Sequence, residues 1–227
     1  VGARATIFVP SNAPETKKAR IRSFGAALRD QERTYDDAQV AAQQFAAASG
    51  ATFVHAFSDA AVVAGQGTIG VEILEDMPHV QDVIVPVGGG GLIAGIGIAL
   101  KSSTESVRVI GVQSTETPAM HLAFQAGHIT DCPHGPTLAD GLAGCTDEIS
   151  YQRTLRVCDD MLLVAETALP AAIRALYRYD GIIAEGAAAV GVAAIVEGVI
   201  TVRGPTVLVI TGGNIDAARF AGILTSD

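Results

Sequence analysis

The sequence predicts an α/β fold in which open, mostly parallel sheets are flanked by helices. Short β-branched runs, such as residues 83–87, alternate with longer segments whose apolar residues recur at helical spacing. Strands that alternate with helices form parallel sheets with right-handed crossovers. Two of the strands run into glycine-rich turns, at residues 88–91 and 211–214. Because open parallel sheets bind ligands beyond the carboxyl ends of their strands, these turns mark the expected binding edge.

Each expected element follows from a local pattern. Apolar and β-branched runs predict strands at residues 5–9, 27–29, 52–54, 83–87, 107–112, 161–165 and 206–210. Helical spacing and end signals predict helices at residues 14–24, 34–50, 60–75, 91–101 and 117–127, from about 167, and after 185. Residues 127–146 form a long irregular segment, and such segments in compact domains are often functional.

The sequence around residues 84–97 is organised as a strand, a bare loop and a helix. The loop consists of four consecutive glycines, Gly88, Gly89, Gly90 and Gly91. Glycine has no Cβ, so its N–H groups can turn toward a ligand, while the following helix N-terminus offers unpaired donors and partial positive charge. A plain tight turn would not need four residues that each lose so much conformational freedom on folding. The pattern therefore predicts an anion site, most often for phosphate.

Two further glycines, Gly65 and Gly67, lie inside the helix expected at residues 60–75. Glycine is costly within a helix, so they indicate close packing or the approach of a ligand.

Composition excludes several classes of protein. The chain has 227 residues, of which 49% are hydrophobic, and a net charge of −9, which argues against a nucleic-acid surface. Its apolar stretches are interrupted before they could span a bilayer, so a membrane protein is not expected. The three cysteines, Cys132, Cys145 and Cys158, are odd in number and lack zinc-site spacing. Ordinary thiols in a reduced, cytoplasmic protein fit this pattern best.

Five motifs occur in one order along the chain: residues 64–68 (AGQGT), 86–92 (PVGGGGL), 139–142 (ADGL), 185–189 (EGAAA) and 211–214 (TGGN). In this order they resemble the pyridoxal-phosphate enzymes of the threonine dehydratase and serine racemase family. The resemblance implies a two-domain, tryptophan-synthase-β-like fold that is truncated at its N-terminus. Residues 1–55 would be the remainder of the small α/β domain, and residues 56–227 most of the large cofactor-binding domain.

The resemblance also implies roles for single residues around pyridoxal 5'-phosphate. The four glycines would bind the cofactor phosphate, and Thr211 would face the pyridine nitrogen. Asp140, Gly141 and Glu185 would line the pocket beside the ring. A neutral hydroxyl at the nitrogen makes the ring a weaker electron sink, which favours loss of a β-substituent. The plainer alternatives are a loop turn at Gly141 and a surface carboxylate at Glu185.

The activity that the resemblance implies is β-elimination of a β-hydroxy amino acid, such as threonine or serine, to a 2-oxo acid and ammonia. The intact enzyme would be a cytoplasmic homo-oligomer, a dimer or tetramer, acting on a small amino acid. Threonine synthase, cysteine synthase, diaminopropionate lyase and racemase activities remain alternatives within the family. The tetraglycine loop argues against the cysteine synthases, whose loop is typically interrupted by threonine.

The lysine that carries the cofactor in this family is missing. It lies in a Ser-x-Lys-x-Arg segment upstream of a Ser-x-Gly-Asn-His loop, and neither occurs here. The three lysines, Lys17, Lys18 and Lys101, fall on no matching position, and none is expected to be buried. We therefore expect a fragment that is inactive by itself. A lysine-free, non-catalytic binding module is the alternative.

The sequence does not predict a metal site. Some relatives bind a divalent cation through an acidic residue, but Gln113 stands at that place with Glu116 nearby, so no metal is expected. His121, His128 and His134 lack ligand spacing and are expected in loops.

The glycine loop also satisfies the loose dinucleotide fingerprint Gly-x-Gly-x-x-Ala at residues 89–94. A nicotinamide-dependent oxidoreductase would need an acid about 20 residues further on. The strand expected there ends at Val112 and Gln113 without one.

Overall fold

The computed structural model describes residues 2–104, 106–131 and 135–226. The chain forms two compact units. The smaller unit takes the chain up to Val54 together with Asn214–Gly222, and the larger takes His55–Gly213 and the chain from Ile223.

The smaller unit contains one parallel pair of strands with its helices. Its elements are β1 (Thr6–Pro10), α1 (Glu15–Ser23), β2 (Ala27–Glu32) and α2 (Tyr35–Ser49). Thr6 lies opposite Ala27 in the parallel ladder. The Thr34 hydroxyl accepts a hydrogen bond from the Asp37 N–H at 3.1 Å, which caps α2 as the sequence predicts. The other end of α2 closes at Gly50 with φ of 69°.

The strand expected at residues 52–54 is wrong. No ladder in the described chain joins these residues to another strand. A strand is defined by backbone bonds to a neighbour, and the apolar pattern of Phe53 and Val54 cannot supply that neighbour.

The larger unit is built on one four-stranded parallel sheet. Its spatial order is β5-β4-β3-β6, with Val83 of β3 opposite Val109 of β4 and Val207 of β6. The elements of the larger unit are α3 (Ala60–Asp76), β3 (Asp82–Pro86), α4 (Gly91–Ser103), β4 (Arg108–Ser114), α5 (Ala119–Ala126), the 3₁₀ turn η1 (Asp140–Leu142), α6 (Glu148–Leu155), β5 (Asp160–Val164), the 3₁₀ turn η2 (Glu166–Ala168), α7 (Leu169–Asp180), α8 (Gly186–Val196) and β6 (Thr206–Leu208). The last helix, α9 (Ala217–Thr225), belongs to the smaller unit up to Gly222.

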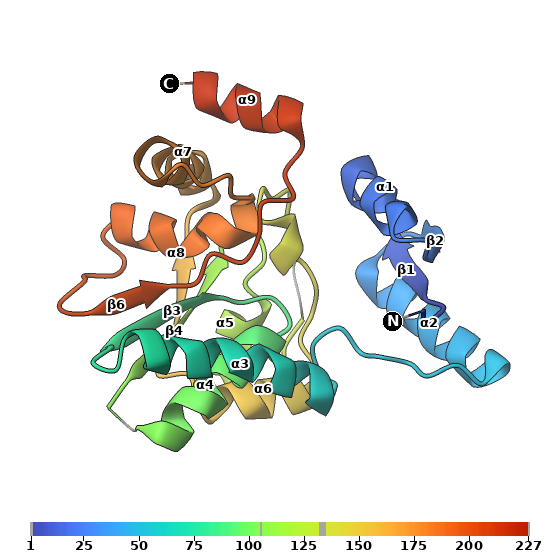
Figure 1. The fold of residues 1–227 in the computed structure, drawn as a ribbon, viewed down its shortest axis with the longest axis horizontal. Coiled ribbons are helices and arrows are strands. Elements are labelled where there is room, and N and C mark those ends of the chain that lie inside the picture. The colour runs from blue at the N-terminus through green and yellow to red at the C-terminus, as the bar shows by residue number, and fades with distance from the viewer. Residues whose placement is uncertain (1, 105, 132–134, 227) are drawn as a thin grey trace. The chain divides into compact units, whose positions relative to one another are not determined.

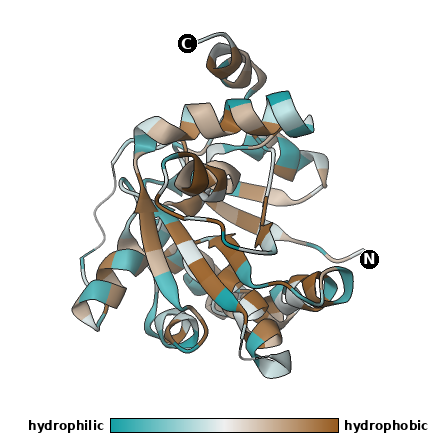
Figure 2. Cartoon of the chain, turned by 90° about the vertical axis from the view of Figure 1, so that its left-hand side faces the viewer, coloured by the Kyte–Doolittle hydropathy of each residue, from teal (hydrophilic) through white to brown (hydrophobic). Residues whose placement is uncertain are grey.

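Helices cover both faces of this sheet. Every residue of β3 is buried, since α4 packs on one face and α8 on the other. Helix α3 packs outside α4, and α7 packs outside α8 (Figure 1). The strands between these layers are largely hydrophobic, while the outer helices carry the hydrophilic residues (Figure 2). This is the arrangement that parallel strands with continuous apolar runs require.

Helices α6 and α9 were not expected from the sequence, and β6 is shorter than expected. Both unexpected helices begin after an aspartate cap: Asp147 accepts from the Ser150 N–H at 2.8 Å, and Asp216 from the Arg219 N–H at 3.0 Å. An aspartate before a short apolar pattern is therefore the signal that would have found them. Past the end of β6, the Val209 N–H still donates to the Ile84 carbonyl at 3.0 Å.

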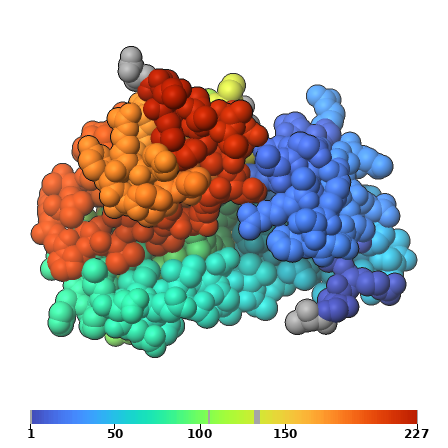
Figure 3. Space-filling model, turned by 45° about the horizontal axis from the view of Figure 1, so that its top comes forward, coloured from blue at the N-terminus to red at the C-terminus, as the bar shows by residue number. Residues whose placement is uncertain are grey.

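The glycines of α3 and α4 bring these two helices into backbone contact. A Cβ on Gly67 would lie 3.3 Å from the Gly95 carbonyl oxygen, and one on Gly70 would lie 2.8 Å from that of Ile96. Close packing is therefore confirmed as the reason for Gly67, whereas Gly65 faces open space. Helix α3 runs along the outer surface of the larger unit (Figure 3). In the described chain no helix combines the length and the apolar character needed to cross a membrane.

Candidate functional site

The two glycine turns follow adjacent strands at the point where the sheet changes its direction of growth. The chain adds β4 and then β5 on one side of β3, and afterwards returns to add β6 on the other side. The loops after β3 and β6 therefore leave the same carboxyl edge of two adjacent strands. Such a topological switch point is where open parallel sheets bind ligands.

The tetraglycine loop is enclosed so tightly that side chains are excluded from it. Gly90 caps α4 with φ of 101°, and a Cβ on Gly88 would lie 3.3 Å from the Leu142 Cα. A Cβ on Gly89 would lie 2.5 Å from the Phe57 ring, and one on Gly91 2.5 Å from the Phe57 carbonyl oxygen. The loop thus presents bare backbone at the N-terminus of α4, which suits an anion.

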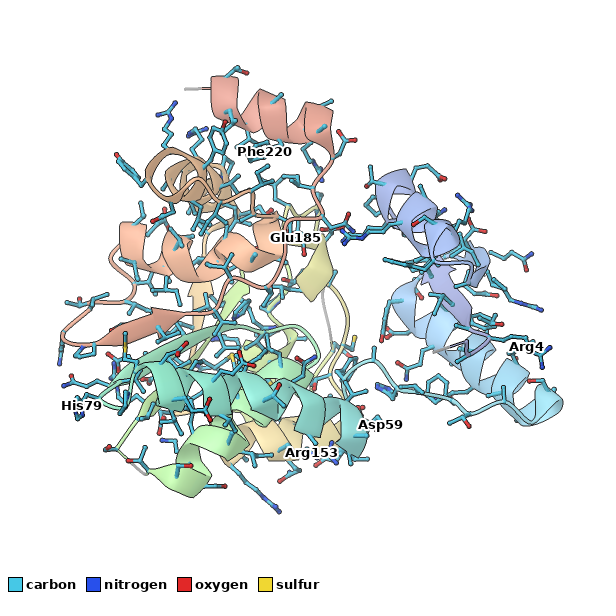
Figure 4. The ribbon with its side chains drawn as sticks, viewed as in Figure 1. Arg4, Asp59, His79, Arg153, Glu185 and Phe220 are labelled. Carbon is cyan, nitrogen blue, oxygen red and sulfur yellow. The ribbon has the colours of Figure 1, made fainter. Side chains whose placement is uncertain are left out.

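Glu185 joins the second glycine turn to the loop that contains Gly141. It stands immediately before α8 (Figure 4), and its N–H donates to the Gly212 carbonyl at 3.0 Å. Its Oε1 lies 2.9 Å from the position of a Cβ on Gly212 and 3.7 Å from one on Gly141. Its Oε2 is buried and has no hydrogen-bond donor among the described residues. A buried carboxylate oxygen without a donor is costly, so this position suits a ligand that donates to it.

The structure therefore brings most of the expected site residues into one cluster. Gly88 abuts Leu142, next to Gly141, and Gly141 abuts Glu185 and thereby the turn at Gly212. Thr211 precedes Gly212 and is exposed in the segment that follows β6. Bare backbone for a phosphate at one end and an unpaired carboxylate oxygen at the other fit a small phosphorylated cofactor.

Phe57, Thr146 and Leu142 contact the glycine loop and were not expected from the sequence. The Thr146 hydroxyl donates to the Gly89 carbonyl at 3.1 Å. Thr146 and Leu142 belong to the irregular segment that length alone marked as functional. Nothing in the sequence near Phe57 marks it, because its contact depends on tertiary packing.

One of the three lysines, Lys18, is buried, although the sequence predicted that none would be. Lys18 is only 7% exposed, and its ammonium lies 2.8 Å from the Ser11 carbonyl oxygen and 3.0 Å from the Asp30 carboxylate. The expectation that no lysine is buried is therefore wrong, because the stem of Lys18 packs within the smaller unit. Its hydrogen bond lowers the pKa of Asp30. Lys101 is paired with Asp159 at 2.8 Å.

Gln113 and the histidines serve structural contacts. Gln113 is fully buried, donates to the Val87 carbonyl at 3.1 Å and accepts from the His121 N–H at 2.8 Å. His121 lies in α5, not in a loop as expected, and its Nδ1 lies 2.7 Å from the Met161 carbonyl oxygen. His128 is exposed beyond α5.

His134 and Cys132 lie outside the described residues. Within residues 2–104, 106–131 and 135–226, no three His, Cys, Asp or Glu side chains are grouped to hold a metal ion.

Away from the cluster, a hydrogen bond from Arg108 to Asp82 raises the pKa of Arg108. This pair joins the amino ends of β3 and β4 at 2.7 Å.

Cys158 gives a pH-dependent prediction. Burial raises the pKa of its thiol to about 12. We expect iodoacetamide at pH 8.5 to leave Cys158 unmodified in the folded protein, because less than about one thiol in a thousand would be ionised. In the unfolded chain the thiol has a pKa of about 8.5, so the raised pKa in the folded state adds its full contribution to stability below that pH. This contribution is lost as the pH rises toward 12. Peptide mass spectrometry with and without urea measures the labelling; equal labelling in both would contradict the prediction.

Comparison with known proteins identifies the family. Residues 1–212 match the family described as "Pyridoxal-phosphate dependent enzyme". The chain belongs to this family. The resemblance inferred from the five motifs is thereby confirmed, and pyridoxal phosphate is the cofactor on which the family depends.

Curated relatives of this pyridoxal-phosphate family member share a name. The chain is 43% identical over 217 residues to "L-threonine ammonia-lyase" of Thermotoga maritima, covering 95% of this chain and 54% of the relative. It is 41% identical over 226 residues to the protein of the same name from Geobacter sulfurreducens, covering 99% and 56%. The chain thus spans about half the length of these curated relatives.

Two similar solved structures confirm the predicted fold class. Maize serine racemase superposes with a TM-score of 0.90 at 26% identity, covering 97% of this chain and 69% of the racemase chain. Threonine deaminase isoform 2 from Solanum lycopersicum gives 0.88 at 30% identity, covering 97% and 62%. The α/β architecture with parallel sheets flanked by helices is common to them.

Proposed function

We propose that the protein to which this chain belongs catalyses β-elimination from a β-hydroxy amino acid, threonine or serine, giving a 2-oxo acid and ammonia. The observation that carries the proposal is the cluster at the sheet's switch point, where the tetraglycine loop, Gly141, Glu185 and the turn after Thr211 converge. The names of the curated relatives support the same chemistry. Racemisation of the same amino acid is the alternative that the solved serine racemase supports.

The chain's own residues would bind and orient the cofactor. Backbone N–H groups of Gly88, Gly89, Gly90 and Gly91 would hold its phosphate at the N-terminus of α4. The buried Oε2 of Glu185 and the hydroxyl of Thr211 would face the opposite part of the cofactor. When bound, pyridoxal phosphate supplies an electron sink for the charge that develops at the substrate α-carbon. A neutral hydroxyl at Thr211 would keep that sink weak and favour elimination.

The chain on its own is proposed to be inactive. The reaction needs a lysine that carries the cofactor and moves the α-proton, but the ammonium groups of Lys18 and Lys101 are committed to carboxylates. On this proposal residues 1–55 belong to the small domain and residues 56–227 to the cofactor domain. The complete protein would be a cytoplasmic dimer or tetramer.

The test compares the protein from the full reading frame with the 227-residue chain. We expect the full protein with pyridoxal phosphate to release ammonia and a 2-oxo acid from threonine or serine, and the chain alone to release neither. Borohydride treatment of the chain with the cofactor should leave no stoichiometric adduct. The dehydratase proposal fails if the full protein releases ammonia from no β-hydroxy amino acid, and formation of a D-amino acid would favour racemisation. A one-to-one lysine adduct on the chain would overturn its inactivity.

A further inference from the structure

We propose that a group of side chains centred on Asp147 positions the glycine loop from the side that the cofactor would not occupy. This Asp147 clamp consists of Asp147, Ser58, His55 and Arg153, and it ties residues 55–58 to the start of α6. The carboxylate of Asp147 accepts hydrogen bonds from both α6 and the segment at residues 55–58. Its Oδ1 accepts from the Ser150 N–H at 2.8 Å, which caps α6, while its Oδ2 accepts from the Ser58 hydroxyl. Capping alone requires only the first of these bonds.

Residues 55–58 are folded into a closed turn by the histidine. The Nδ1 of His55 accepts from the backbone N–H groups of Phe57 at 3.3 Å and Ser58 at 3.1 Å. An Nδ1 that accepts two bonds carries no proton, so the proton of a neutral ring resides on Nε2. That Nε2 lies 3.7 Å from the second oxygen of Asp147. The histidine thus holds the turn with one nitrogen and faces the clamp carboxylate with the other.

Helix α6 also binds the turn at residues 55–58 through Arg153. Its Nη1 donates to the Ser58 carbonyl at 2.7 Å, and the Ser150 hydroxyl lies 3.1 Å from that of Ser58. Both the side chain and the backbone of Ser58 are therefore bound to α6. Figure 4 labels Arg153 on this helix and Asp59 at the adjoining N-terminus of α3.

The clamped segments carry the two groups that touch Gly89. Phe57 lies inside the turn, and its ring and backbone abut Gly89 and Gly91. Thr146 directly precedes Asp147, and its hydroxyl holds the Gly89 carbonyl at 3.1 Å. In a trans peptide the C=O and the following N–H point in opposite directions. Fixing the Gly89 carbonyl on Thr146 therefore points the Gly90 N–H away from Thr146.

The inference rests on the proposed cofactor site and adds positioning residues to it. Ser58, His55 and Asp147 would act through Phe57 and Thr146 on the shape of a loop whose glycines have no side chains to hold it. Preorganised donors bind more tightly because less conformational entropy is lost when the ligand arrives. Loss of the clamp should therefore loosen the loop before it unfolds the helices.

The first measurement is amide hydrogen exchange at residues 88–92 of the chain without cofactor. Ser58→Ala removes the hydroxyl from the clamp, and Ser58→Thr keeps one. We expect Ser58→Ala to raise exchange at residues 88–92 by about tenfold, as loss of a hydrogen bond to a charged group would, with rescue by Ser58→Thr. The matched control is Asp59→Ala, since Asp59 caps α3 through the Ala61 N–H at 2.7 Å. That variant should raise exchange at the start of α3 and leave residues 88–92 unchanged.

The second measurement is a fluorescence titration of the same variants with pyridoxal phosphate. We expect Ser58→Ala to weaken binding by about three- to tenfold, and Asp59→Ala to leave it unchanged. Unchanged exchange at residues 88–92 in Ser58→Ala overturns the clamp whatever the affinity. Faster exchange with unaltered affinity overturns its role in cofactor binding. Faster exchange in Ser58→Ala, together with a full-length protein that binds no pyridoxal phosphate, would support the clamp and contradict the proposed cofactor site.

Discussion

Gly91→Ala is expected to abolish retention of pyridoxal phosphate by the full-length protein. The new Cβ would lie 2.5 Å from the Phe57 carbonyl oxygen and 2.8 Å from the Phe57 Cα. Both are backbone atoms that no rotamer change can move, so the first turn of α4 or the segment at Phe57 must shift. At a cost of about 1 to 3 kcal/mol for such overpacking, binding through the loop would weaken by about five- to 150-fold. Cofactor absorbance after gel filtration measures the loss.

The control for this variant is Gly222→Ala. Gly222 lies within α9, and a Cβ there meets nothing within 4 Å. This variant should keep a full complement of cofactor, and far-UV circular dichroism should show that both proteins are folded. If Gly91→Ala retained stoichiometric cofactor, the tetraglycine loop would not be the phosphate site.

Gly95→Ala is expected to destabilise the larger unit strongly. A Cβ at Gly95 would lie 2.4 Å from the Val63 carbonyl oxygen and 2.8 Å from the Gly67 nitrogen, so α3 and α4 would have to separate. We expect the free energy of unfolding to fall by about 2 to 3 kcal/mol, at the upper end of measured overpacking. Urea denaturation followed by circular dichroism measures the change.

Gly65→Ala tests whether the position, and not the residue type, produces this loss. Gly65 lies in α3 and faces open space. Because alanine is the better helix former, this substitution should raise the free energy of unfolding by about 0.5 to 1 kcal/mol. Similar losses in both variants would mean that the helix contact does not account for the effect of Gly95→Ala.

Predictions from the sequence succeeded where local chemistry decides the structure. The cap at Thr34, the strand at residues 83–87 and the bare loop after it depend on neighbouring residues, and the structure places them as expected. The short capped helices α6 and α9 were missed because each has little more than two turns of periodicity. The strand expected at residues 52–54 was wrong because pairing requires a partner that lies elsewhere in the chain.

In the candidate site, too, the sequence predicted the local features but not the contacts between distant segments. Its residue types were visible in the sequence, because glycine runs at strand ends and the ordered motifs are local patterns. Their arrangement was not visible: the contact of Glu185 with Gly212 and Gly141, and the seating of Phe57 on the glycine loop, join residues far apart in the chain. The burial of Lys18 was likewise decided by Asp30 and Ser11 across the smaller unit.

The residue patterns alone were enough to recognise an α/β protein of the pyridoxal-phosphate family and a bare glycine loop at residues 88–91 between a strand and a helix. Glycine's lack of a Cβ and the spacing of apolar residues are properties of the chain alone, so they could be recognised without coordinates. The side chains that surround this loop depend on tertiary packing and could not be predicted from the sequence. Whether Asp147, Ser58 and Thr146 can hold Gly89 depends on distances of about 3 Å between separate segments, and hydrogen bonds are lost within a fraction of an ångström beyond that.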